Sequence, residues 1–158
     1  MNWVLELTEQ ATLVDDPDRP DVLVSGALHG DERVGPTVTL ELARWLLLST
    51  SGWARRLLRT RRLLLMPLTN AIGYARRTRT EAGSDPNRDF SYQQKASACM
   101  ETVAGRSVNE ILRHHLVQLL LTYHGGMQAV GYVWGDFAHY GRATGNRSPD
   151  HELSLIHI

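Results

Sequence analysis

Two histidines and a glutamate are the residues of this chain whose types and spacing best fit catalysis. His29 and Glu32 lie three residues apart, and His124 follows the apolar run 116–122. Two imidazoles and one carboxylate are a common ligand set for a catalytic zinc ion, whose fourth position stays open for water. We therefore predict that His29, Glu32 and His124 bind Zn2+.

The same residues also have a structural explanation. A His-x-x-Glu pattern is short and is typical of a polar turn before a helix, and a single histidine often packs or forms hydrogen bonds without a metal. The zinc hypothesis therefore depends on context. Gly26 and Gly30 flank His29, and an apolar run precedes both His29 and His124.

The segment Asp85-Pro86-Asn87-Arg88-Asp89-Phe90 is suited to holding a carboxylate. Arg88 can form two parallel hydrogen bonds to a carboxylate, which lysine cannot do, and Asn87 adds a neutral donor. Asp85 can accept the second ring proton of a zinc-bound histidine and so fix its tautomer. The alternative is an Asp-Pro-Asn turn with an exposed arginine.

Strands and helices alternate along the part of the chain that positions these residues. Apolar runs predict strands at 3–7, 22–27, 63–67, 116–122 and 128–134. Helical spacing predicts helices at 36–48 and 100–115, a short helix or exposed turn at 53–62, and a long polar loop at 69–92. This alternation predicts an α/β fold with ligands at the carboxyl ends of its strands.

Length and composition fit one domain with its own core. Lys+Arg and Asp+Glu number 17 each, so the balanced charge gives no reason to expect binding to nucleic acid or to a membrane. The single cysteine, Cys99, cannot form an internal disulfide, and the first residues lack the features of a signal peptide. These features favour a cytoplasmic location and leave the oligomeric state open.

Four motifs follow one another along the chain: Gly-Ala-Leu-His-Gly-Asp-Glu, Asn-Ala-Ile-Gly-Tyr with arginines after it, Asp-Pro-Asn-Arg-Asp-Phe, and Tyr-His-Gly-Gly. In this order, over roughly residues 22–135, they resemble the zinc metallocarboxypeptidases of the carboxypeptidase A/B clan. The resemblance implies a mixed central sheet flanked by helices. It also implies a zinc-dependent enzyme that hydrolyses the C-terminal bond of a peptide or protein.

The resemblance further implies a role for each site residue. Asn87 and Arg88 would hold the terminal carboxylate of the substrate, and Asp85 would be the partner of the zinc ligand His29. One arginine before that segment would stabilise the oxyanion of the scissile carbonyl. Arg76, Arg77 and Arg79 compete for this role, and spacing favours Arg77, with Arg79 second.

The chain departs from the family pattern in its last part. The family's general-base glutamate lies many tens of residues after the last zinc ligand, whereas Glu152 is the only glutamate after His124. Residues 153–158 continue no earlier pattern and resemble the translation of a sequencing adaptor. We therefore expect a partial catalytic domain at 1–152, a non-native tail at 153–158, and no activity from this fragment.

Two other functions stay open. A zinc amidase of the aspartoacylase or desuccinylase type, acting on small N-acyl amino acids, shares the His-Gly-x-Glu form and the Asn-Arg pair. A non-catalytic module that binds chain termini would keep the carboxylate grip without needing an open metal site. Pro86 and Gly125 replace the residues that are more usual in the family and leave the substrate undefined.

Overall fold

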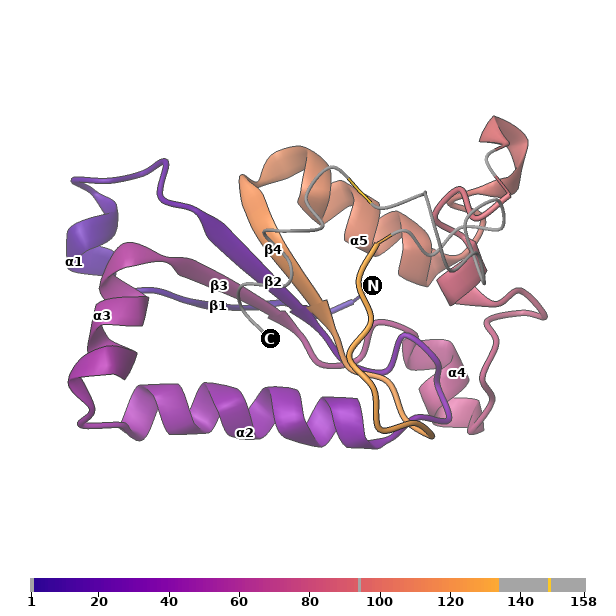
Figure 1. Ribbon diagram of the computed structural model, residues 1–158, viewed down its shortest axis with the longest axis horizontal. Helices are drawn as coiled ribbons and strands as arrows, with labels where there is room; N and C mark the ends of the chain where they lie inside the picture. The colour runs from indigo at the N-terminus through magenta and orange to yellow at the C-terminus, as the bar shows by residue number, and fades with distance from the viewer. Residues whose placement is uncertain (1, 94, 134–147, 149–158) are drawn as a thin grey trace.

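The computed structural model describes residues 2–93, 95–133 and 148, and a four-stranded sheet lies at its centre (Figure 1). The strands are β1 (Leu5–Leu7), β2 (Asp21–Ser25), β3 (Arg62–Met66) and β4 (Val117–Thr122), in the order β1-β3-β2-β4. β2 is parallel to β3 and β4, whereas β1 is antiparallel to β3. This mixed sheet flanked by helices confirms the predicted fold class.

Helices cover both faces of the sheet. They are α1 (Gln10–Leu13), α2 (Val34–Leu48), α3 (Gly52–Thr60), α4 (Ala71–Arg76) and α5 (Val103–His114), with short 3-10 turns η1 (Pro86–Arg88) and η2 (Ala96–Ala98). α2 and α3 lie on one side of the sheet and α5 on the other (Figure 1). Within the described ranges, no helix combines the length and apolar character needed to cross a membrane.

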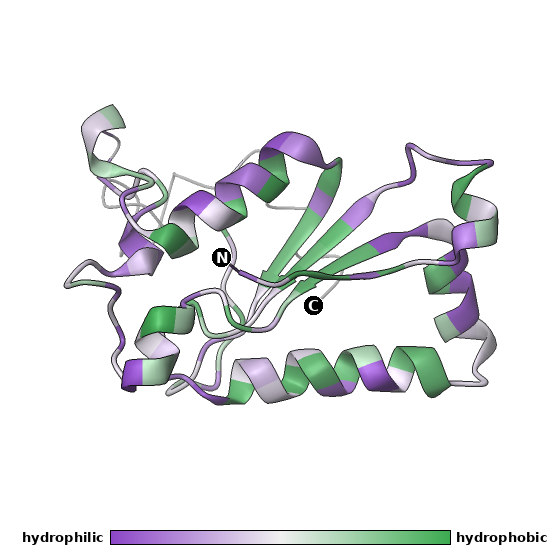
Figure 2. Cartoon of the chain, turned by 180° about the vertical axis from the view of Figure 1, so that it is seen from behind, coloured by the Kyte–Doolittle hydropathy of each residue, from purple (hydrophilic) through white to green (hydrophobic). Residues whose placement is uncertain are grey.

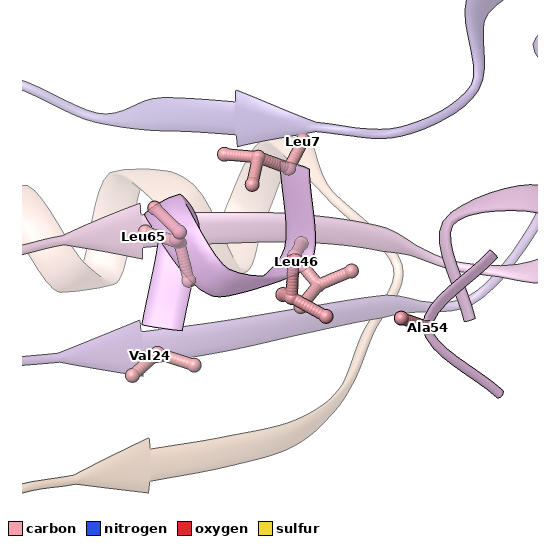
Figure 3. Close-up of a cluster of buried hydrophobic side chains, with 7 residues drawn as sticks. Leu7, Val24, Leu46, Ala54 and Leu65 are labelled. Atoms are coloured by element: carbon pink, nitrogen blue, oxygen red, sulfur yellow. The ribbon is translucent and has the colours of Figure 1, made fainter. Parts of the chain in front are cut away.

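The core consists of two apolar layers, one on each side of the sheet. Leu63 and Leu65 of β3 pack with Leu46 of α2 (Figure 3), whereas Leu64 packs with Val108 of α5. Successive side chains of a strand point to opposite faces, so a strand buried on both sides has a continuous apolar run. β2 and β3 are buried in this way, whereas β4 is also apolar over most of its length but exposes Leu119, Leu120 and Leu121 (Figure 2).

A buried ion pair holds together the starts of β2 and β3. It lies at the end of the sheet opposite the loops that follow β2 and β4. The carboxylate of Asp21 is fully buried and accepts two hydrogen bonds from Arg62, at 2.7 and 2.9 Å. These bonds to Asp21 raise the pKa of the Arg62 guanidinium above its usual value. Because Asp21 begins β2 and Arg62 begins β3, the pair sets the register of the two central strands.

Two of the predicted elements were wrong. The stretch 69–92 is not a continuous loop, because its polar residues cap short helices: Asn70 accepts a hydrogen bond from the Gly73 N–H, and Asp85 accepts one from the Asn87 N–H. Residues 128–133 form no strand, because they pair with no described strand and Val130 and Val133 lie exposed instead of packing in a layer. Trp134, Glu152 and the tail 153–158 lie outside the described residues.

Candidate metal centre

The sheet brings His29 and His124 together across 95 residues of sequence. His29 lies four residues after the end of β2, and His124 lies two residues after the end of β4. β2 and β4 are adjacent and parallel, and Ser25 lies opposite Thr122 in their register. Both histidines therefore emerge from the same edge of the sheet, as the sequence predicts for carboxyl ends of parallel strands.

The three predicted ligands converge at this edge. The Nδ1 atoms of His29 and His124 lie 3.1 Å apart, and each lies 2.8 Å from one carboxylate oxygen of Glu32. Ligand atoms around a tetrahedral zinc ion at about 2.0–2.1 Å lie about 3.3 Å from one another. The spacing and donor types of His29, Glu32 and His124 therefore fit zinc, and these atoms form one candidate metal-binding group.

The backbone around His29 is tightly packed against the loop that follows β3. The Gly26 N–H donates to the Met66 carbonyl at 2.9 Å, and the Asn70 N–H donates to the Ala27 carbonyl at 2.9 Å. A Cβ at Gly30 would overlap backbone atoms of Gly73 and Tyr74. Glycine at position 30 therefore lets this loop approach α4 closely and holds His29 at the edge of the sheet.

Asp85 lies beside the ring of His29, for which the sequence predicts it as a hydrogen-bonding partner. The Asp85 Oδ1 atom lies 3.1 Å from the Nε2 atom of His29, and His29 is almost fully buried. A hydrogen bond from Nε2–H to Asp85 leaves the Nδ1 lone pair of His29 free to face a metal. The same carboxylate accepts the Asn87 N–H at 2.8 Å, so η1 is tied to the metal-binding group.

The two carboxylates at the site are held in their charged forms. Burial by itself raises the pKa of Glu32, but hydrogen bonds from the Gly125 N–H, His29 and His124 outweigh it, and the net pKa is below its ordinary value. Burial likewise opposes the charge on Asp85, whereas the Asn87 N–H and the charges of His29 and Arg79 lower its pKa overall. Negative charge is thus concentrated where a divalent cation would bind.

Among the candidate arginines, the structure places Arg79 at the site. Its guanidinium lies 3.3 Å from Glu32 Oε1 and 3.1 Å from Asp85 Oδ2. Arg77 instead ends α4 in a left-handed backbone conformation, with φ of 55°, and its side chain is exposed. The geometry therefore favours Arg79 over Arg77, which the spacing had ranked first.

Asn87 and Arg88, the residues predicted to hold a substrate carboxylate, lie two and three positions after Asp85. Asn87 and Arg88 belong to η1, and the exposed Arg88 guanidinium stacks over the ring of Tyr92 at 4.7 Å. A contact that sequence reasoning missed is the Gly125 N–H, which donates to Glu32 Oε2 at 2.9 Å. The two glycines after His124 are a signal for such a close backbone approach, although a turn has the same signal.

Comparison with known proteins agrees with this geometry. A family model described as zinc carboxypeptidase (Peptidase M14) matches residues 2–155. The chain belongs to the zinc carboxypeptidase family. Enzymes of this family are hydrolases that use Zn2+, which agrees with the ligand set of the metal-binding group.

The relatives of this zinc carboxypeptidase chain are considerably longer. Carboxypeptidase SOL1 of Arabidopsis thaliana is 27% identical over 138 residues, which cover 84% of this chain and 28% of that protein. Carboxypeptidase D of Homo sapiens is 29% identical over 165 residues, which cover 87% of this chain and 12% of that protein. The chain thus spans less than a third of either curated relative.

Solved structures show the same fold. The thrombin activatable fibrinolysis inhibitor superposes with a TM-score of 0.76 at 18% identity, covering 98% of this chain and 45% of that chain. A metallo-carboxypeptidase from Pseudomonas aeruginosa superposes with a TM-score of 0.63 at 19% identity, covering 79% of this chain and 32% of that chain. These likenesses support the carboxypeptidase-like sheet and its flanking helices.

Proposed function

We propose that this chain forms the metal-binding part of a zinc carboxypeptidase that removes residues from the C-terminus of a peptide or protein. The convergence of His29, Glu32 and His124 within hydrogen-bonding distance of one another carries this proposal. A structural histidine needs one polar partner, whereas here two ring nitrogens and a carboxylate face one point. That arrangement is chemically suited to a divalent cation.

Each site residue has a proposed task. His29, Glu32 and His124 would hold a zinc ion, which would supply Lewis acidity towards the scissile carbonyl and towards the attacking water. Asp85 fixes the tautomer of His29. Asn87 and Arg88 bind the free carboxylate at the end of the substrate, since a guanidinium can pair with both carboxylate oxygens.

Arg79 is the proposed oxyanion stabiliser in place of Arg77. Its guanidinium already lies against Glu32 and Asp85, so it stands at the edge of the metal-binding group. A positive charge fixed at that place stabilises the negative charge that develops on the carbonyl oxygen during hydrolysis. The ion pairs with two carboxylates hold this side chain before substrate binds.

The general base is the one function that these residues do not supply. Among the described residues, the carboxylate of the metal-binding group is that of Glu32. A carboxylate bound to the metal is not available to accept a proton from water. We therefore expect the 158-residue chain to bind zinc and to hydrolyse no peptide.

Two measurements test the proposal. Zinc titration by calorimetry should show one site in the parent chain, loss of that site in Glu32→Gln, and no change in the control Glu41→Gln, whose exposed carboxylate pairs with Arg44. Incubation with an unmodified peptide, followed by mass spectrometry, should show no release of C-terminal residues. Absence of zinc binding by the parent would refute the metal site, and peptide trimming would refute the claim of inactivity.

A further inference from the structure

The loop that carries Arg79, Asp85 and Arg88 is attached at both ends to the first turn of α5. Glu81 lies two residues after Arg79, and Asp89 lies one residue after Arg88. Both carboxylates are buried, and among the described residues neither forms a hydrogen bond with an arginine, lysine or histidine. Burial of two charged groups needs compensation, and the partners that provide it are on α5.

Asp89 binds the residues immediately before the helix. Its Oδ1 atom accepts the Glu101 N–H at 2.8 Å, and its Oδ2 atom accepts the Thr102 N–H at 2.8 Å and the Thr102 hydroxyl at 2.7 Å. The Asp89 carbonyl also accepts the Met100 N–H at 2.8 Å. The end of the loop is therefore fixed by four hydrogen bonds through a single residue.

Glu81 binds the next two backbone donors of the same turn. The Val103 N–H donates to Glu81 Oε1 at 2.6 Å, and the Ala104 N–H donates to Glu81 Oε2 at 3.0 Å. The first N–H groups of a helix have no partner within the helix, and a negative charge is favoured there. The first turn of α5 and the residues before it thus stabilise both buried carboxylates with backbone N–H donors and no positively charged side chain.

Gly105 leaves the space that Asp89 occupies. A Cβ at position 105 would overlap the Asp89 carboxylate and crowd the Thr102 hydroxyl. Alanine is otherwise preferred to glycine inside a helix by about 1 kcal/mol. The small residue at this position is therefore explained by the carboxylate that lies against it.

From these contacts we propose that Asp89 and Glu81 are positioning residues that set Asn87 and Arg88 for substrate binding, whereas Asp85 is held in place by its own bonds to His29 and Arg79. We call the contacts of Asp89 and Glu81 with the start of α5 the α5 anchor. This inference rests on the proposed function, because it holds that the α5 anchor places Asn87 and Arg88 where they can bind a substrate carboxylate. Neither Asp89 nor Glu81 contacts the metal-binding group in the described bonds. Loss of the anchor should therefore weaken binding of a substrate carboxylate while zinc affinity is retained.

The test compares two small ligands on the zinc-loaded chain. N-acetylalanine carries the terminal carboxylate, and N-acetylalaninamide has the same shape without the charge. Binding of each is measured by calorimetry for the parent, Asp89→Ala, Gly105→Ala and the double variant. The matched control is Glu110→Gln, which removes an exposed charge from the other end of α5, where Glu110 pairs with Arg113.

We expect Asp89→Ala and Gly105→Ala each to weaken N-acetylalanine binding on the order of tenfold, the size typical of a lost supporting contact. The double variant should lose no more than either single variant, because both changes remove the same contact. Zinc affinity and binding of N-acetylalaninamide should stay unchanged, as should all measurements on Glu110→Gln. A helix cap with no effect on the loop would leave the preference for the carboxylate ligand intact.

The outcomes separate this inference from the proposed function. Unchanged N-acetylalanine affinity in Asp89→Ala and Gly105→Ala, with zinc still bound, overturns the positioning role alone. No binding of N-acetylalanine by the zinc-loaded parent refutes the carboxylate grip itself. Amide hydrogen exchange of the peptide 84–91 then tests the anchor independently: exchange as slow in Asp89→Ala as in the parent contradicts it. Glu81→Gln provides a second variant, in which the same peptide should exchange faster.

Discussion

Replacing Asp85 by asparagine should weaken zinc binding although Asp85 itself binds no metal. The Asp85 carboxylate receives three hydrogen bonds, from His29 Nε2, Arg79 Nε and the Asn87 N–H. Asparagine has one oxygen and one NH2 group, so the NH2 group must face either His29 or Arg79, both of which donate. In one orientation the bond from His29 is lost, and in the other it is kept but ends on a neutral amide oxygen instead of a carboxylate, so the support of His29 is weaker in both.

The size of the effect follows from the loss or weakening of that bond. A hydrogen bond to a charged group contributes about 1.5–3 kcal/mol. Each tenfold change in affinity corresponds to about 1.4 kcal/mol, so transmission of the whole loss to the metal site gives a decrease of roughly 10–100-fold. That range agrees with the usual effect of removing a carboxylate that supports a metal-binding histidine.

Competition with a chromophoric chelator at pH 7 measures the zinc affinity. Asp31→Asn is the matched control, because Asp31 is exposed, lies next to Glu32, and loses the same charge. We expect the control to bind zinc within about twofold of the parent, as exposed charges interact weakly in water. Equal zinc affinity of Asp85→Asn and the parent would refute the orienting role, and equal weakening in both variants would reduce it to a charge effect.

Three further changes should alter stability in defined directions. Gly30→Ala should lower the melting temperature of the chain, because the added Cβ overlaps the loop at α4 and overpacking costs about 1–3 kcal/mol of stability. Gly52→Ala, where a Cβ meets open space, should not lower it, and equal melting temperatures of the two variants would contradict the close approach. Asp21→Asn should destabilise the fold by about 3 kcal/mol, since it leaves the Arg62 charge without its buried partner, and urea unfolding measures this loss. Without metal, the folded-state pKa of Glu32 is below its ordinary value of 4.5, so its contribution is present above pH 4.5 and is lost as the pH falls through the lowered value. Melting curves from pH 7 to pH 3 should therefore show a smaller acid destabilisation for Glu32→Gln than for the parent.

The residues of the candidate metal site could be named from the sequence, because local sequence patterns show where the apolar strands end. Apolar runs located β2, β3 and β4, and the residues just after β2 and β4 include the two histidines that meet at the metal-binding group. Asp85 could be assigned to His29 by its motif. Arg77 and Arg79 could not be ranked by spacing, because the left-handed backbone at Arg77 turns the chain and directs the later arginine to Glu32.

The contacts of Glu81 and Asp89 with the start of α5 could not be predicted from local sequence patterns either. Glu81 lies 22 residues from Val103, and Asp89 lies 13 residues from Thr102. Nothing in the spacing of these residues requires them to meet, since the contact depends on where α5 packs against the sheet. The same reason applies to residues 128–133, whose apolar pattern predicts a strand, although a strand forms only where the fold brings a partner strand beside it.

By itself, the sequence of this chain determined the main strands β2, β3 and β4 and the helices α2 and α5, and which side-chain types were candidates for a metal site and for a carboxylate grip. These properties depend on side-chain chemistry and on periodicities of a few residues. Only the tertiary structure decided that His29 and His124 meet across 95 residues, that Arg79 stands at the site, and that α5 holds the loop beside it. Such contacts depend on the pairing register of β2 with β4 and on single backbone turns, which fix distances that no local pattern contains.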